Sequence, residues 1–102
     1  DEGDAFGLGQ SDDAFVVAEA AEVLGLRRES HAISSLLRLV RPGANPIARK
    51  AAITALGRLG DRSVVDAIVP ALDERALEEA AALALLMLGD RRGVAFHAEA
   101  LT

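Results

Sequence analysis

The stretch from Asn45 to Leu72, NPIARKAAITALGRLGDRSVVDAIVPAL, predicts two short antiparallel helices joined by a turn. Asn45 is a favourable N-cap, and Pro46 fits the first helical position, where a backbone N–H has no partner within the helix. Apolar residues then recur at three- and four-residue spacing up to Gly60, which suits a left-handed C-cap. Because few residues separate the two helices, they must lie side by side.

The second helix of this hairpin is also amphipathic. Ser63-Val64-Val65-Asp66 matches a capping box, with Asp66 in the role usually taken by Glu or Gln. Apolar residues follow at positions i, i+3, i+4 and i+7, namely Val65, Ile68, Val69 and Leu72. A hairpin this short does not bury two apolar faces alone, so it requires stacked neighbours.

Copies of the hairpin occur on both sides of it. Leu59-Gly60-Asp61-Arg62 returns 29 residues later as Leu88-Gly89-Asp90-Arg91. Going back 35 residues, Leu24-Gly25-Leu26-Arg27 takes the same place. The sequence therefore predicts an all-α fold, a short α–α superhelix of about three helical hairpins. Their expected ranges are about 11–40, 45–72 and 74–101.

Residues 51–72, and with gaps 80–101, follow the pattern A-A-x-A-L-G-x-L-G-D-x-x-x-V-x-x-L. This pattern resembles the HEAT repeat superfamily, specifically its short bacterial form, the phycocyanobilin (PBS) lyase HEAT-like repeat. Arg62 and Arg91 stand where the family usually has proline, and Leu26 replaces its aspartate. The resemblance covers roughly residues 12–101 and implies a right-handed, armadillo-like solenoid. It implies no single function, because such repeats serve in scaffolds, adaptors, chromophore lyases and nucleic-acid enzymes.

Charge is distributed unevenly along the chain. The net charge is −5, and the first 13 residues hold five acids and neither Lys nor Arg. We expect residues 1–10 to be a flexible acidic tail or linker and residues 11–102 to be a single HEAT-like repeat domain, part of a longer chain. The rest of the chain carries 11 acids and 11 bases, so it is neutral. A neutral body argues against nucleic-acid binding, which needs a clear positive surplus.

Two further features of composition limit the function. The chain has no cysteine, which excludes disulfides, thiolate zinc sites and a cysteine nucleophile. The longest apolar run, Ala80 to Leu88, is far shorter than the ~18 residues that span a membrane. We therefore expect no membrane partner and a cytoplasmic location.

The strongest candidate site is a row of arginines just past the turn glycines. Arg27, Arg62 and Arg91 occupy this place in the three copies, with Arg28 and Arg92 beside two of them. Stacking should align them along one edge. One interpretation is a contact strip for an acidic partner or a phosphate-bearing ligand. The other is an internal ladder, in which Asp61 and Asp90 neutralise the arginines and cap the following helices.

A second candidate is the C-terminal end of the solenoid. Met87 aligns with Arg58, so a surface position has become apolar, and we expect it to pack under the last helix or against a further repeat. Phe96 and His97 lie in that last helix, where His97 takes a core position. An end cap or an interface is predicted here. His31 should be an ordinary surface residue, and no ligand cluster accompanies either histidine.

Charges on the first helices alternate from copy to copy. Arg49 and Lys50 of the second copy should face Glu78 and Glu79 of the third. We interpret these as exposed pairs that fix the stacking order and contribute little each.

No Ser/His/Asp grouping or recognisable pair of catalytic carboxylates is present, so no enzymatic activity and no cofactor are expected. The leading hypothesis is a protein-binding scaffold or adaptor whose partner is another protein, acidic at its contact, with homodimerisation through the open end as a further option. The resemblance implies a second hypothesis, an accessory of bilin attachment, against which the scarcity of aromatic residues counts. A HEAT-like nucleic-acid enzyme is the third.

Overall fold

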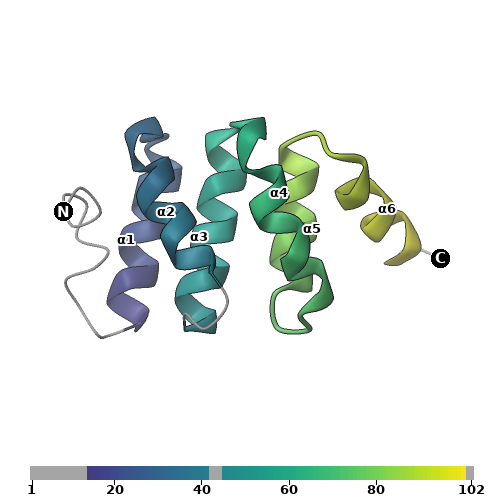
Figure 1. Cartoon of the computed structure of the whole chain (residues 1–102), viewed down its shortest axis with the longest axis horizontal. Helices are drawn as coiled ribbons and strands as arrows, with labels where there is room; N and C mark the ends of the chain where they lie inside the picture. Colours follow the sequence, from purple (N-terminus) through teal and green to yellow (C-terminus); the bar gives the residue numbers. More distant parts are fainter. Residues whose placement is uncertain (1–13, 42–44, 101–102) are drawn as a thin grey trace.

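The first helix of each hairpin packs against the next first helix, so helices α1, α3 and α5 form one layer (Figure 1). The computed structural model describes residues 14–41 and 45–100, and for residues 96–100 only the backbone. Every regular element within these ranges is helical, which confirms the all-α repeat fold. The molecule is elongated, with extents of 43 × 23 × 19 Å.

The helices follow the predicted hairpins. The α-helices are α1 (Ala14–Leu26), α2 (Ile33–Val40), α3 (Pro46–Leu59), α4 (Val65–Ile68), α5 (Glu78–Met87) and α6 (Arg91–Ala100). Three 3-10 helices join them: η2 (Ser30–Ala32), η3 (Arg62–Val64) and η4 (Val69–Asp73). Three hairpins are therefore present, although the predicted start of the first helix at residue 11 and the predicted acidic tail lie outside the described residues.

Helix α3 begins and ends as the sequence predicts. The Asn45 side chain accepts a hydrogen bond from the Ile47 N–H at 2.8 Å, and Pro46 follows as the first helical residue. At the other end Gly60 adopts a left-handed conformation with φ of 78°. Local capping chemistry therefore sets both ends of this helix.

The second helix of the central hairpin differs from the prediction. The capping box at Ser63 is wrong, because Asp61 is the cap and its Oδ1 accepts from the Ser63 N–H at 2.9 Å. The continuous helix is also wrong: α4 ends at Ile68 and passes into η4. Pro70 explains the change, since it lacks an N–H and its ring clashes with the carbonyl four residues earlier in an α-helix.

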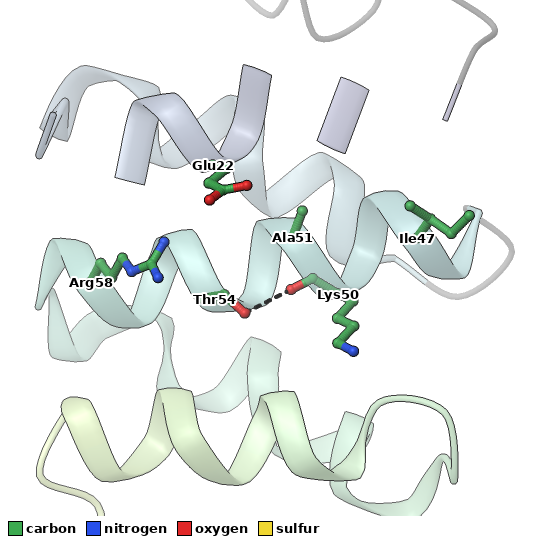
Figure 2. A pocket seen from close by; sticks show the side chains of 6 residues that line it. All are labelled: Glu22, Ile47, Lys50, Ala51, Thr54 and Arg58. Atoms are coloured by element: carbon green, nitrogen blue, oxygen red, sulfur yellow. Dashed lines mark hydrogen bonds between the residues drawn. The ribbon is translucent and has the colours of Figure 1, made fainter. Parts of the chain in front are cut away.

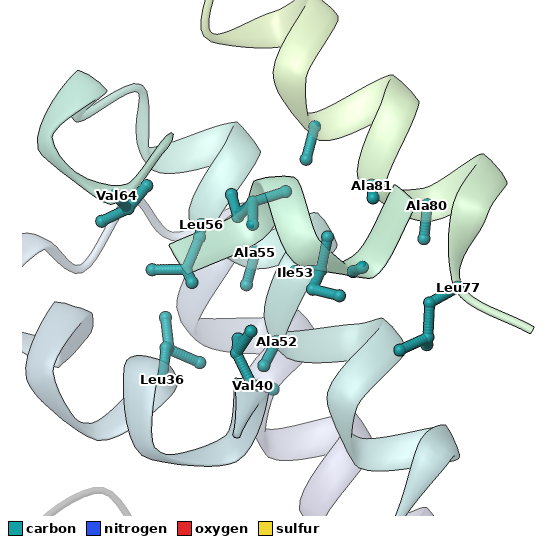
Figure 3. Packing of buried hydrophobic residues seen from close by; sticks show 14 of the residues in the cluster. Leu36, Val40, Ala52, Ile53, Ala55, Leu56, Val64, Leu77, Ala80 and Ala81 are labelled. Atoms are coloured by element: carbon teal, nitrogen blue, oxygen red, sulfur yellow. The ribbon is translucent and has the colours of Figure 1, made fainter. Parts of the chain in front are cut away.

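Fully buried aliphatic side chains fill the space between the two helical layers (Figure 3). The largest of them come from α2 to α5 and from the residue just before α5: Leu36, Ile53, Leu56, Ile68, Leu77 and Leu85. The layer of first helices is held together by small residues instead. A Cβ added at Gly25 would lie 2.7 Å from the Ala55 Cα, and one added at Gly57 would lie 2.8 Å from the Ala84 Cα. These helices therefore approach each other almost backbone to backbone.

The left-handed residue of each turn fixes the register of the copies. It is Arg28 (φ 53°) after α1, Gly60 after α3 and Gly89 (φ 77°) after α5. In the first turn the N–H three residues past the helix, that of Glu29, donates to the Leu24 carbonyl at 3.0 Å. The third turn repeats this bond from Asp90 to Leu85 at 2.8 Å.

The predicted register of the first copy was therefore wrong by three residues. Gly25 is not a C-cap. It lies inside α1, at the place equivalent to Gly57, where only glycine permits the contact with the next helix. The prediction that Gly25 is equivalent to Gly60 was wrong because a sequence does not distinguish a glycine needed for a turn from one needed for close helix packing.

The interpretation of Arg49 as a surface charge facing Glu78 was also wrong. Arg49 is only 6% exposed. Its Nε donates to the Val40 carbonyl at 3.1 Å, and its two Nη atoms donate to the two carboxylate oxygens of Glu74 at 2.8 and 2.6 Å. One guanidinium thus connects the end of α2 with the loop before α5. The backbone at Glu74 is extended, and α5 starts at Glu78 rather than near Glu74.

Candidate binding edge at the turns

The turns after α1, α3 and α5 lie at the same end of the molecule, the upper edge in Figure 1. All five predicted arginines, which we call the arginine edge, are exposed there: Arg27, Arg28, Arg62, Arg91 and Arg92. The three-copy alignment holds for Arg62 and Arg91, each of which follows a capping aspartate. It was wrong for Arg27, which lies one residue before the left-handed Arg28.

The internal-ladder interpretation describes one part of this edge. Asp90 accepts from the backbone N–H of Arg92 at 2.9 Å and from its Nε and Nη2 at 2.8 Å. The Arg92 guanidinium above all, and the more distant charge of Arg62, hold the pKa of the Asp90 carboxyl well below its usual range. Ser63 lowers the pKa of Asp61 in the preceding turn through its hydrogen bonds to the carboxylate. The guanidinium of Arg92 is therefore already paired with a carboxylate of this chain.

The other arginines of the edge are not occupied in this way. Arg27, Arg28 and Arg91 make no hydrogen bond or ion pair through their side chains with the part of the chain that the structure describes. Arg62 acts on Asp90 only at longer range. Most of the positive charge on this edge is thus left without a direct counter-ion among the described residues.

A hollow of about 490 Å³ opens beside the arginine edge, across the C-terminal ends of α1 and α3. Its lining combines two cations, apolar side chains and helix-end glycines: Gly25, Leu26, Arg28, Gly57, Arg58, Leu59, Gly60 and Met87. None of these described lining residues is acidic. The corrected register places Leu26, Arg58 and Met87 at one equivalent position on the three first helices. The sequence alignment paired only Arg58 with Met87, so this set was missed.

A second depression of about 440 Å³ continues along the surface of the first helices (Figure 2). Glu22 reaches it from α1, and α3 supplies Ile47, Lys50, Ala51, Thr54 and Arg58. The Thr54 hydroxyl donates to the Lys50 carbonyl at 3.1 Å, a bond along the helix that leaves the lysine ammonium available. Both depressions include Arg58 in their lining, so they adjoin at this side chain on α3.

The predicted end-cap residues are only partly placed by the structure. The Met87 side chain lies against α3, because a Cβ added at Gly57 would be only 2.9 Å from the Met87 Cε. It also lines the hollow. Phe96 and His97 lie on α6, but their side chains fall outside the described residues. His31 is exposed, as predicted.

The described ranges contain no group of three His, Asp or Glu side chains arranged to hold a metal ion. Among the helices of the same ranges, none is long and apolar enough to cross a membrane.

Stacked helical hairpins whose first helices each end at a left-handed residue define a helical repeat domain, with the arginine edge along its turns. Residues 48–74 match the family model of the PBS lyase HEAT-like repeat, so the central hairpin is a repeat of this kind and the predicted resemblance is confirmed. No curated protein and no solved structure matches the chain at a significant level.

Proposed function

We propose that this HEAT-like repeat domain is a non-catalytic scaffold that binds another protein through its arginine edge. The observation that carries the proposal is the exposed row of arginines, most of which lack a counter-ion in the described structure. Like charges held close together on one edge repel each other, so a partner that supplies carboxylates is favoured there.

The packing of the first helices supports this function. The close contacts at Gly25 and Gly57 leave little room for the three turns to move relative to one another. A preformed edge binds a partner without an ordering cost of its own, which is how rigid repeat arrays present extended binding surfaces.

Affinity capture with matched charge-reversal variants tests the proposal. The edge variant is Arg27/Arg62/Arg91→Glu. The control variant, Arg38/Arg41/Arg75→Glu, makes the same change in net charge with exposed residues at the opposite end of the helices. Circular dichroism verifies that both remain helical, and mass spectrometry identifies what each captures from a lysate of the native cell.

The proposal predicts a protein that wild type and the control variant capture and the edge variant does not. Capture should also weaken as salt is raised, because exposed charges are screened. Equal capture by all three forms would contradict the role of the edge and move the search to the surface of the second helices. Capture of nothing specific by wild type would contradict protein binding itself.

A further inference from the structure

Arg28 has a backbone conformation that its residue type disfavours. Its φ of 53° lies in the left-handed region, where the two equivalent turn positions hold Gly60 and Gly89. A side chain with a Cβ is strained there, whereas glycine is not. Such a residue persists when something compensates for the strain, and functional sites are where this is commonly found.

The side chain of Arg28 indicates what that compensation is. It lines the hollow together with Arg58, and neither guanidinium forms a hydrogen bond or ion pair within residues 14–41 and 45–95. Two cations thus face one hollow with no acid among its described lining residues. Their combined field favours a ligand that carries negative charge.

The walls of the hollow are apolar as well as cationic. Leu26 and Met87 are 61% and 40% exposed, and both line this hollow. Gly25 and Gly57 also line the hollow and add no side chain to it. A ligand that covered Leu26 and Met87 would gain about 25 cal/mol for each Å² of apolar surface removed from water.

We propose that this hollow binds an acidic peptide segment of a partner protein. Carboxylates of the segment pair with Arg28 and Arg58, and one large apolar side chain lies between Leu26 and Met87. The inference deepens the proposed function and rests on it, because it names the site and the chemistry of the partner.

The shape of the surface favours a peptide over a small molecule. Sites for small ligands usually enclose most of the ligand, whereas this hollow is open to solvent. A second depression shares Arg58 with the hollow and follows a path along α3 toward Ile47. At a rise of about 1.5 Å per residue that path is roughly 16 Å long, the length of about five extended residues. Glu22 and Lys50 lie along it, so the acidic end of the segment belongs at the arginines.

Fluorescence anisotropy with short labelled peptides tests the inference. The probe is Glu-Glu-Phe-Glu-Glu, and the comparison peptide has serine in place of phenylalanine. The site variant is Arg28→Gly/Arg58→Ala. Glycine suits the left-handed conformation of the first turn, and alanine at position 58 preserves helix α3. The control variant, Arg41→Ala/Arg75→Ala, removes the same charge from the opposite end.

We expect wild type and the control variant to bind the phenylalanine peptide at least tenfold more tightly than the site variant does. The serine peptide should bind wild type at least fivefold more weakly than the phenylalanine peptide. Equal binding by the site and control variants, or no binding to wild type, would overturn the inference. Displacement of the peptide by an equal concentration of dodecanoate would overturn it in favour of a small amphipathic anion.

The substitutions used here are not those of the edge variant, so the two proposals fail separately. If the peptide does not bind but the edge variant fails to capture the protein that wild type captures, the proposed peptide site in the hollow is wrong and the proposed function stands. If the peptide binds as expected but the edge variant captures the same protein as wild type, the proposed role of the arginine edge is wrong and the peptide site in the hollow stands.

Discussion

The two ends of helix α3 use arginine in opposite ways. At the N-terminal end Arg49 is buried, and its guanidinium is satisfied by the Val40 carbonyl and by both oxygens of Glu74. At the C-terminal end Arg58 and its neighbour Arg28 line an open hollow without a partner in the described structure. The difference separates charge that maintains the fold from charge that is available to a ligand.

The backbone shows the same contrast. Asn45 caps the start of α3 with a side chain suited to that role, and Gly60 ends the helix without strain. Arg28 occupies the place of Gly60 in the first turn and is strained there. A position that sacrifices stability for a charged side chain is a candidate for function.

Removal of the buried arginine should have the largest effect. Arg49→Ala leaves the Val40 carbonyl and the Glu74 carboxylate without their donor, so we expect the free energy of unfolding to fall by about 2 kcal/mol. Urea denaturation followed by circular dichroism measures the change. Lys50→Ala, the adjacent exposed position, is the control and should stay within about 0.5 kcal/mol of wild type. Similar losses of unfolding free energy in Arg49→Ala and Lys50→Ala would contradict the claim that Arg49 maintains the fold at the N-terminal end of α3.

The same ion pair should give a specific dependence on pH. Arg49 lowers the pKa of the Glu74 carboxyl below its ordinary value of 4.5, so the stability that this group contributes is present above pH 4.5 and is lost as pH falls further. The Tm of wild type should therefore exceed that of Glu74→Gln at pH 7, and the gap should narrow below pH 4.5. Because Glu74 is 42% exposed and stays hydrated in part, the effect should be smaller than that of Arg49→Ala. A gap that is constant with pH would show that the charge of Glu74 is not what matters.

Substitution of the turn glycine sharpens the backbone comparison. A Cβ at Gly60 would meet no atom within 4 Å, so Gly60→Ala adds only the strain of the left-handed conformation. We expect a loss of about 1 kcal/mol in the free energy of unfolding. Gly60→Asn should lose less, since asparagine tolerates this conformation better. Equal losses for alanine and asparagine would indicate a cause other than backbone strain.

The smallest effect should have the opposite sign. Arg28→Gly relieves the strain in the first turn but makes the unfolded chain more flexible, so we expect the free energy of unfolding to rise by about 0–1 kcal/mol. Urea denaturation again supplies the measurement, with Arg27→Gly at the neighbouring non-left-handed position as the matched control, which should be destabilised. A clear loss of stability in Arg28→Gly would mean that Arg28 serves the fold.

Local sequence chemistry was sufficient for part of this structure. Asn45, Pro46 and Gly60 set the ends of α3 through groups within a few residues of each other, so the sequence predicted them. Arg49 could not be assigned in this way, because its partners Val40 and Glu74 lie on other elements and are brought to it only by stacking.

The hollow was missed for a related reason. The arginine edge follows from the turn motif, but the hollow requires the correct register of the first copy. An alignment of the first two copies with an offset of 32 residues would have given the correct register. It places Gly25 on Gly57 and Leu36 on Ile68. That offset also places Arg28 on Gly60, a substitution that sequence patterns alone give no reason to expect.

The most direct test is a urea denaturation of wild type and Arg28→Gly, each with and without the peptide Glu-Glu-Phe-Glu-Glu. A ligand that binds only the folded state raises the unfolding midpoint in proportion to its affinity. We predict that the peptide raises the midpoint of wild type, and that Arg28→Gly starts at an equal or higher midpoint and responds much less. An equal rise in both proteins would contradict the claim that Arg28 keeps its strained place in order to bind a partner.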